Sequence, residues 1–207
     1  MSEEPSVLIL AAGASQRLGE PKALARIGPR TALEHLLTAC GSNQPPTVVT
    51  GAHEAEIAAH LKEAADGAPE ANLAFNAAWA RGRTGSVQRG ARALADRDIL
   101  LAPIDVPLVP SEVFTRLRRE WTRAGRPAMG WLAPSAPDRE GHSRPGHPIV
   151  IGRGLVEPLS RLDPDAPLKL LREHADPVWM VEVGAVEIHD DLDRPEDLEE
   201  LRRRFLP

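Results

Sequence analysis

Runs of consecutive apolar residues, each about as long as one strand, recur along the chain and are separated by segments with a helical repeat. A strand that is apolar on both faces is typical of a sheet covered by helices on its two sides. The strands predicted in this way cover residues 6–12, 47–51, 72–76, 98–104, 128–133, 147–152 and 178–183.

The segments between these runs place apolar residues three or four positions apart, as one-sided helices do. Thr31, with Glu34 three residues later, predicts a capping box for a helix that ends at Gly41. Further helices are expected at residues 54–65 (ending at Asp66 and Gly67), 86–95, 111–125, 167–175 and 194–205. The alternation of strand and helix predicts a three-layer α/β/α fold around a mixed, mostly parallel sheet.

Residues 134–146 interrupt this alternation because proline, glycine, serine and charged residues dominate them. A segment this polar is not expected to pack inside a domain. We therefore predict a long loop or flap between two strands.

Composition narrows the class of protein. The 207 residues are 42% hydrophobic and 27% charged, as in ordinary globular proteins, and we expect one domain over residues 1–207. The net charge is −5 and the basic residues are scattered, so nucleic acid is not an expected partner. A single cysteine, no membrane-length apolar run and an acidic N-terminus favour a cytoplasmic protein that binds a small molecule.

Small residues follow the first predicted strand, where parallel α/β sheets bind their ligands. Ala11 to Ser15 form this run, and Arg17 and Lys22 come soon after it. Successive free N–H groups in such a turn can bind an anion. The segment matches neither a Walker A loop nor the three-glycine dinucleotide spacing, so a tight turn with two solvated cations stays an equal alternative.

Carboxylates at two distant places could hold a metal ion. Asp105 directly follows an apolar strand and is flanked by prolines, which suits a ligand of Mg²⁺ as well as a turn residue. Asp191 and Asp193 lie between a short predicted strand, which ends before Asp190, and the last helix, and helix capping explains Asp193 well. One carboxylate from each half of the chain would complete a site that neither half could make alone.

Two further segments hold weaker candidates. Gly82 precedes Ser86, where a helix is expected to begin, so Ser86 could donate to a base or phosphate or merely cap the helix. Arginines in this loop, including Arg83, make it positive but are more often only solvated. His147, before Pro148 at the start of a strand, could touch a substrate or be structural. No zinc pattern and no covalent nucleophile is found.

Five segments resemble, in the same order, motifs of the MobA-like nucleotidyltransferases, in particular the branch of molybdenum cofactor cytidylyltransferase. "LAAGASQRLGEPKAL" is similar to the signature LAAGxSxRxGxxK, and "NAAWARGRTGSVQRG" to N-x-x-W-x-x-G with its following serine. "APIDVPLV" resembles the metal strand D-x-P-x-V, and "GHPIVI" and "DLDRPEDL" resemble the later motifs. The resemblance implies a fold of the nucleotide-diphospho-sugar transferase (Rossmann-like) type and transfer of a nucleoside monophosphate with release of pyrophosphate.

The resemblance also implies roles for individual residues. Arg17 would steady the triphosphate, Lys22 the α-phosphate, and Asp105 would bind Mg²⁺ together with Asp191 or Asp193. The catalytic set would thus be Arg17, Lys22 and Asp105. Nucleotide contacts are implied for Leu10, Ala11, Ala12, Gly13, Ala14, Ser15, Arg17, Lys22, Gly82 and Ser86.

The substrates follow from finer details of the same resemblance. Members that use guanine tend to read LAGG where this chain has Ala12, which favours CTP. The acceptor would be a phosphorylated small molecule such as molybdopterin, held near His147 and Pro148, with a molybdoenzyme or its maturation factors as possible partners. "SRLDPDAPLKLLREHAD" departs from the usual G-D-x-G-A-R, so a sugar- or polyol-phosphate transferase, or a non-catalytic nucleotide- or pterin-binding accessory protein, stays an alternative.

Overall fold

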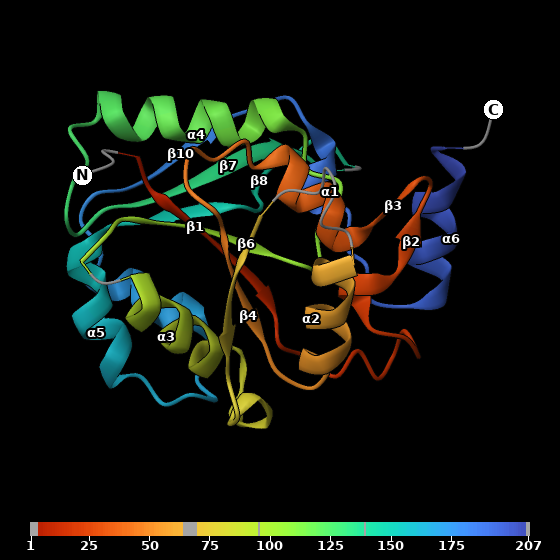
Figure 1. Ribbon diagram of the computed structural model, residues 1–207. Helices are drawn as coiled ribbons and strands as arrows, with labels where there is room; N and C mark the ends of the chain where they lie inside the picture. The colour runs from red at the N-terminus through yellow and green to blue at the C-terminus, as the bar shows by residue number, and fades with distance from the viewer. Residues whose placement is uncertain (1–3, 64–69, 95, 139, 206–207) are drawn as a thin grey trace.

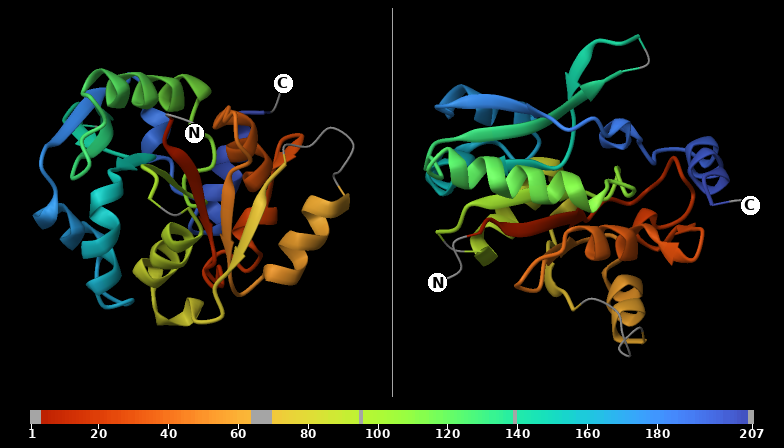
Figure 2. Two further views of the ribbon diagram at one scale, coloured as in Figure 1. Left: turned by 60° about the vertical axis from the view of Figure 1, so that its left-hand side comes forward. Right: turned by 90° about the horizontal axis from the view of Figure 1, so that it is seen from above.

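The computed structural model describes residues 4–63, 70–94, 96–138 and 140–205, and it has three layers, helix on sheet on helix (Figures 1 and 2). Helices α1 (Ala32–Ala39) and α4 (Ser111–Arg123) lie on one face of the sheet. Helices α3 (Arg83–Leu94) and α5 (Val156–Arg161) lie on the other. The predicted α/β/α architecture is confirmed.

The main sheet has eight strands in the order β10-β7-β9-β6-β1-β4-β5, with β8 paired to β7. Neighbours from β5 to β6 run parallel, β9 runs antiparallel to both β6 and β7, and β10 is parallel to β7. The strands are β1 (Ser6–Ala11), β4 (Thr47–Thr50), β5 (Asn72–Phe75), β6 (Ile99–Pro103), β7 (Trp131–Pro137), β8 (Ser143–Pro145), β9 (Ile149–Ile151) and β10 (Val178–Glu182). The mixed, mostly parallel sheet is as predicted.

Alternation along the central strand β1 explains its unbroken apolar run. Val7 and Ile9 pack into the hydrophobic cluster beneath α1 and α4. Leu8 and Leu10 point the other way, into the cluster beneath α3 and α5. Successive side chains of a strand point to opposite faces, so a strand between two layers must be apolar at every position.

The first helix confirms its predicted capping box. The backbone N–H of Glu34 donates to Thr31 Oγ1 at 3.2 Å, and the N–H of Thr31 donates to the Glu34 carboxylate at 2.7 Å. Helix α2 (Glu54–Glu63) is also found as expected, while its predicted end at Asp66 and Gly67 lies outside the described residues. The last helix, α6, covers Pro195–Arg203.

Four expectations about elements were wrong. Helix α3 begins at Arg83 rather than Ser86, and residues 167–175 hold a 3₁₀ helix, η4 (Leu168–His174), rather than an α-helix. The strand expected before Asp190 is the 3₁₀ helix η5 (Val186–His189). The strand expected from residue 128 begins at Trp131, the first residue of β7. The sequence patterns also missed α5 and the small antiparallel hairpin of β2 (Arg26–Ile27) and β3 (Arg30–Thr31).

The flap predicted at residues 134–146 is largely a β-hairpin. Strand β7 continues through Pro137 and pairs antiparallel with β8, and the turn is closed by a bond from Asp138 N–H to the carbonyl of His142 (2.9 Å). Ser135 and Ala136 are buried, so small and polar residues pack here against η5. Proline is tolerated at a strand position whose backbone N–H is not needed for a ladder hydrogen bond. The polar, proline-rich composition therefore led to the prediction of a loop where a hairpin forms.

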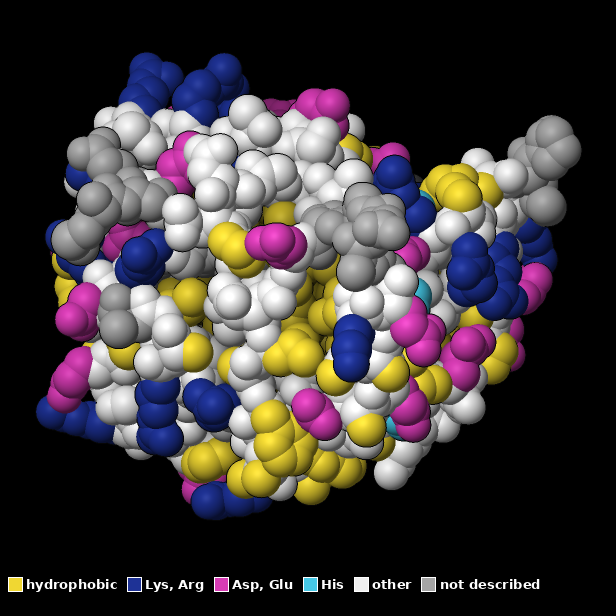
Figure 3. Space-filling view, in the orientation of Figure 1, with side chains coloured by type: hydrophobic (Ala, Val, Ile, Leu, Met, Phe, Trp, Pro, Cys, Tyr) yellow, Lys and Arg dark blue, Asp and Glu magenta, His cyan; other side chains and the backbone are white. Residues whose placement is uncertain are grey.

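The opposite edge of the sheet is apolar on its outer face. Leu73 and Phe75 of the edge strand β5 are 40% and 48% exposed. In the space-filling view, hydrophobic side chains gather over this strand in the middle of the face (Figure 3). Among the described residues, no helix has the length and hydropathy needed to cross a membrane.

Gly51, which follows β4, lies at a tightly packed place between the backbone of Ala12 and the side chain of Trp79. A Cβ at this position would lie 2.4 Å from the Ala12 carbonyl oxygen and 2.6 Å from Trp79 Cβ. We expect Gly51→Ala to lower the free energy of unfolding by about 1–3 kcal/mol, because backbone and packed side chains would have to move apart. Urea unfolding measures the change.

Gly13→Ala is the matched control, because a Cβ there meets no atom within 4 Å. It should leave the stability within about 0.5 kcal/mol of the wild type. Equal stability of the two variants would contradict the packing argument.

Candidate active site

The loop between β1 and the 3₁₀ helix η1 (Lys22–Leu24) is folded back on itself. Ser15 has a positive φ of 53°, and its carbonyl accepts the N–H groups of Leu18 and Gly19, both at 3.1 Å. The Ser15 hydroxyl accepts the backbone N–H of Lys22 at 3.0 Å. His53 Nε2 lies 3.2 Å from the Ala14 carbonyl oxygen. These contacts fix where the Lys22 side chain starts.

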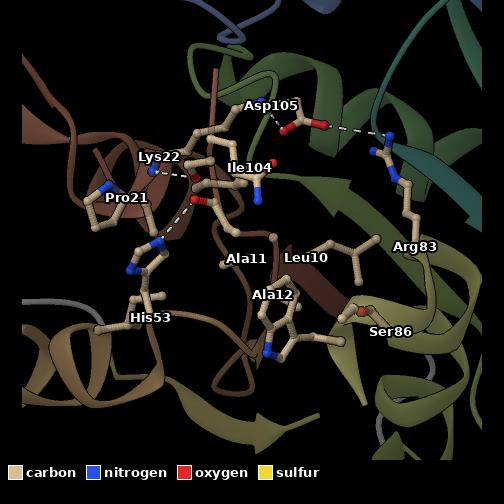
Figure 4. Close-up of a pocket in the computed structure, with 18 of the residues that line it drawn as sticks. Leu10, Ala11, Ala12, Pro21, Lys22, His53, Arg83, Ser86, Ile104 and Asp105 are labelled. Atoms are coloured by element: carbon tan, nitrogen blue, oxygen red, sulfur yellow. Dashed lines mark hydrogen bonds and ion pairs between the residues drawn. The ribbon is translucent and has the colours of Figure 1, made fainter. Parts of the chain in front are cut away.

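A cavity of about 570 Å³ opens where the parallel strands β1 and β6 end (Figure 4). Most of the site residues predicted from the sequence line it, namely Leu10, Ala11, Ala12, Gly13, Ala14, Ser15, Arg17, Lys22, Gly82, Ser86, Asp105 and Asp193. His53, Trp79, Arg83 and Ile104 line it as well. Asp191, His147 and Pro148 do not.

The ammonium of Lys22 joins two carboxylates from distant parts of the chain. Its Nζ lies 2.9 Å from Asp105 Oδ1 and 2.5 Å from Asp193 Oδ1, and only 12% of the side chain is exposed. The backbone N–H of Leu192 donates to the Asp105 carbonyl at 2.7 Å. This bond holds the C-terminal segment beside the end of β6.

Two arginines extend this charge cluster. Arg17 lies 3.0 Å from Asp193 Oδ2, and Arg83 lies 3.6 Å from Asp105 Oδ2. The hydrogen bond from Lys22, helped by the charges of Lys22 and Arg17, lowers the pKa of Asp193. Among the described residues that line the cavity, three cations (Arg17, Lys22 and Arg83) outnumber two carboxylates, so the cavity favours an anionic ligand.

Asp193 and Asp191, which precede α6, differ in their surroundings, and neither accepts the N–H bonds at the start of this helix that Asp197 accepts. The alternative interpretation of Asp193 as a helix cap was wrong, because Asp197 accepts the N–H groups of Asp193 and Arg194 at 2.9 and 2.8 Å. Asp193 is thereby free to face Lys22. Asp191 lies nearby at the surface, and partial desolvation together with the charges of Asp193 and Asp105 raises its pKa.

Asp105 and Asp193 offer the oxygen ligands that a hard divalent cation prefers. Their carboxylates converge on Lys22 Nζ, which occupies the position of positive charge between them. Mg²⁺ or a similar ion would take this position when Lys22 turns away to a phosphate. Asp191 does not form a compact triad with them. Within the described residues, the group of three with ligand atoms all within 4.8 Å is Asp138, Glu140 and His142, at the exposed turn of the β7–β8 hairpin.

Gly82 and Ser86 form the wall opposite the charge cluster. A Cβ at Gly82, whose φ is 133°, would lie 2.4 Å from the Pro164 carbonyl oxygen, so the chain passes here without a side chain. Ser86 is buried in the first turns of α3, and its Oγ accepts from the Asn76 amide at 3.1 Å. Its own O–H can therefore point to a ligand.

His147 lies apart from this cavity and lines a second one of about 370 Å³. Its Nδ1 is fully buried and has no hydrogen-bond partner among the described residues. Burial, together with the nearby charge of Arg83, lowers the pKa of His147 to about 4, so the ring is neutral at neutral pH. Pro148 is buried and lines neither cavity.

The sequence patterns did not identify Arg83 as a residue of the cavity. The interpretation of this arginine as merely solvated was wrong, because its side chain lines the cavity and pairs with Asp105. Its position directly after Gly82, at the start of a helix that faces the sheet edge, was the signal that could have identified it.

A family model and known structures place the chain among nucleotidyltransferases by similarity. The model described as "MobA-like NTP transferase domain" matches residues 7–178. The comparison with curated proteins finds no match.

Solved structures share the fold at low sequence identity. Rv0371c from Mycobacterium tuberculosis H37Rv aligns with a TM-score of 0.75 and 24% identity, covering 98% of this chain and 99% of that one; its complex with manganese aligns with a TM-score of 0.70 and 21% identity over 97% and 98%. Molybdopterin-guanine dinucleotide biosynthesis protein A from Archaeoglobus fulgidus has a TM-score of 0.70 and 18% identity over 96% and 97%. The 2-C-methyl-D-erythritol 4-phosphate cytidylyltransferase from Thermus thermophilus has a TM-score of 0.67 and 21% identity over 98% of both chains.

The Lys22 contact predicts an unusually acidic Asp193. In a carboxyl ¹³C NMR titration, Asp193 should titrate below the ordinary value of about 3.9 because Lys22 donates to its charged form. Lys22→Met should move the midpoint upward. A pKa lowered by folding stabilises the protein above the unfolded value, and this contribution is lost as pH falls through the lowered value.

Lys62→Met, which removes an exposed lysine of α2, serves as the control and should leave the Asp193 midpoint unchanged. Urea unfolding across pH 3 to 6 should show the difference in stability between wild type and Asp193→Asn shrinking toward the acid end. A midpoint that does not respond to Lys22→Met would refute the proposed cause.

Proposed function

The chain belongs to the MobA-like NTP transferase family and is a nucleotidyltransferase, and we propose that it moves CMP from CTP onto a phosphorylated small molecule in a Mg²⁺-dependent reaction. Molybdopterin is the acceptor that we favour, and pyrophosphate is the leaving group. Residues 1–207 would act as one domain, in the cytoplasm, with a molybdoenzyme or its maturation factors as possible partners.

The observation that carries this proposal is the charge cluster at the ends of β1 and β6. Attack on an α-phosphorus builds negative charge on its equatorial oxygens and on the leaving pyrophosphate, so preorganised cations supply most of the catalysis. Arg17 would hold the triphosphate, and Lys22 would contact the α-phosphate. The backbone N–H groups from Ala12 to Ser15 would add donors for the phosphates, as turns of small residues do.

Asp105 and Asp193 would hold Mg²⁺, with Asp191 as a further carboxylate at the rim. When bound, the ion would neutralise charge on the phosphates. The protein's own part is to hold the two carboxylates together, with Lys22 between them until it turns to the α-phosphate. Asp193 ionises readily there because Lys22 lowers its pKa.

The base would lie between Ala12 and the wall formed by Gly82 and Ser86. The Ser86 hydroxyl could donate to a carbonyl of a pyrimidine, and the methyl group of Ala12 narrows the space beside β1. Both residues are buried at the cavity wall. The Ser86 hydroxyl could bind a carbonyl of either base, so it is the narrower space beside Ala12 that supports CTP over GTP.

The acceptor would occupy the second cavity, next to His147. The neutral imidazole could accept or donate one hydrogen bond there without adding charge. Pro148 would act only by shaping the backbone that presents His147, since it lines neither cavity.

Turnover tests the enzymatic proposal. Each nucleoside triphosphate is supplied with Mg²⁺ and a panel of phosphorylated acceptors, and pyrophosphate release is measured. We expect release with at least one acceptor, and a drop of about 10²–10³-fold in Asp105→Asn because one group of the charged cluster is lost.

Glu112→Gln removes an exposed carboxylate on α4 and should keep wild-type turnover. Binding of CTP by the wild type without pyrophosphate release for any acceptor would instead support the non-catalytic accessory protein. No binding of any nucleoside triphosphate would reject the nucleotide site itself.

Base preference is tested by thermal unfolding with saturating Mg²⁺. A ligand that binds the folded state raises its stability by an amount set by concentration over Kd, about 1.4 kcal/mol for each tenfold in affinity. CTP should raise the Tm more than GTP. UTP serves as the matched comparison for ring size, and a larger shift with GTP would refute the assignment to a pyrimidine.

A further inference from the structure

The second cavity is positively charged at its mouth and apolar at its base. The cations are Arg83, Lys169 and Arg172, and no Asp or Glu is among the described residues that line it. Leu101, Trp131 and Ile149 form the apolar base. A cavity of this kind favours an anion with an apolar body.

Strand β10 extends the apolar surface outward. Val178 and Met180 are two residues apart on this strand, so their side chains share a face. They line the cavity and are 40% and 54% exposed. Exposed apolar side chains beside a cationic mouth suit a ligand larger than a bare phosphate ion.

Arg83 is, among the described residues, the one shared by both cavities. As the first residue of α3 it extends toward Asp105, as Figure 4 shows. Its guanidinium lies 3.6 Å from Asp105 Oδ2, and 48% of the side chain is exposed. Partly exposed pairs at this distance are weak, so the guanidinium can turn to a substrate at little cost.

We propose that Arg83 binds the attacking phosphate of the acceptor and presents it to the nucleotide, while the body of the same acceptor packs against the apolar base of the second cavity. The inference rests on the proposed nucleotidyl transfer. An anionic nucleophile must approach both a triphosphate and Asp105. A cation at the junction of the cavities offsets that repulsion, and a guanidinium can bind a phosphate through two parallel hydrogen bonds.

The chemistry of the step agrees with a phosphate nucleophile. One acceptor oxygen bonds to the α-phosphorus while the bond from that phosphorus to the α–β bridging oxygen breaks, and the electron pair leaves with pyrophosphate. An ionised phosphate needs no base for this. A hydroxyl acceptor would need one, and among the described residues lining the second cavity the available base is His147, whose Nδ1 is fully buried.

Lys169 and Arg172 would hold the remaining charge of the acceptor. They are three residues apart on the 3₁₀ helix η4, a spacing that places side chains on the same side of such a helix. Both are exposed at the cavity mouth. They would therefore draw the acceptor in, whereas Arg83 would orient it.

The test is isothermal titration calorimetry of the full chain with 1-naphthyl phosphate, an apolar phosphomonoester, with and without Mg²⁺ and a non-hydrolysable CTP analogue. 1-Naphthol and inorganic phosphate are the matched partial ligands. We expect 1-naphthyl phosphate to bind at least tenfold more tightly than either one. Arg83→Met should weaken its binding about tenfold or more, and Arg83→Lys should lose less.

Arg92→Met removes an exposed arginine from the same helix and should bind like the wild type. Unchanged thermal unfolding of Arg83→Met would show that the variant is folded. Wild-type affinity in Arg83→Met would overturn the role of Arg83, and equal binding of 1-naphthol would overturn the contribution of the phosphate to binding in this cavity. Both results are independent of CTP binding and pyrophosphate release, which test the proposed function separately.

Discussion

The candidate site depends on one cation that is largely shielded from solvent, Lys22. Lys22 Nζ contacts Asp105 and Asp193, which are 83 and 171 residues away in sequence. Like charges repel at such distances, so the two carboxylates can share this place only around a positive charge. The C-terminal segment, the loop after β1 and the end of β6 are thus held together by Lys22 and by the bond from Leu192 to the backbone of Asp105.

The direction of the strands explains why these groups meet. Strands β1 and β6 are parallel neighbours, so the residues that follow both strands emerge at the same edge. Strand β9 runs antiparallel between β6 and β7 and begins just after His147 and Pro148. Because β9 is antiparallel to β6, His147 lies at the same end of the sheet as the residues that follow β6, and the second cavity forms there beside the first.

The features that were predicted correctly from the sequence depend on residues that are close together along the chain. The capping box of Thr31 and Glu34 involves residues three apart, and the apolar run of β1 reports burial on both faces. Asp105 was recognisable because it follows a buried strand and stands among prolines. The wrong predictions fall where the composition of a segment does not reflect its burial or its backbone conformation. Ser135 and Ala136 are buried although their segment has a polar composition. Leu168–His174 forms a 3₁₀ helix although its leucine spacing is typical of an α-helix.

The sequence by itself determined the layered fold, the loop of small residues with its two cations, and the set of aspartates near the metal position. Only the tertiary structure decided which of these groups meet. Asp193 faces Lys22 because Asp197 takes over the capping of α6, and Arg83 stands between two cavities because α3 begins earlier than its pattern indicated. Such pairings join residues that are far apart along the chain, and they depend on strand order and helix placement, which no local pattern contains.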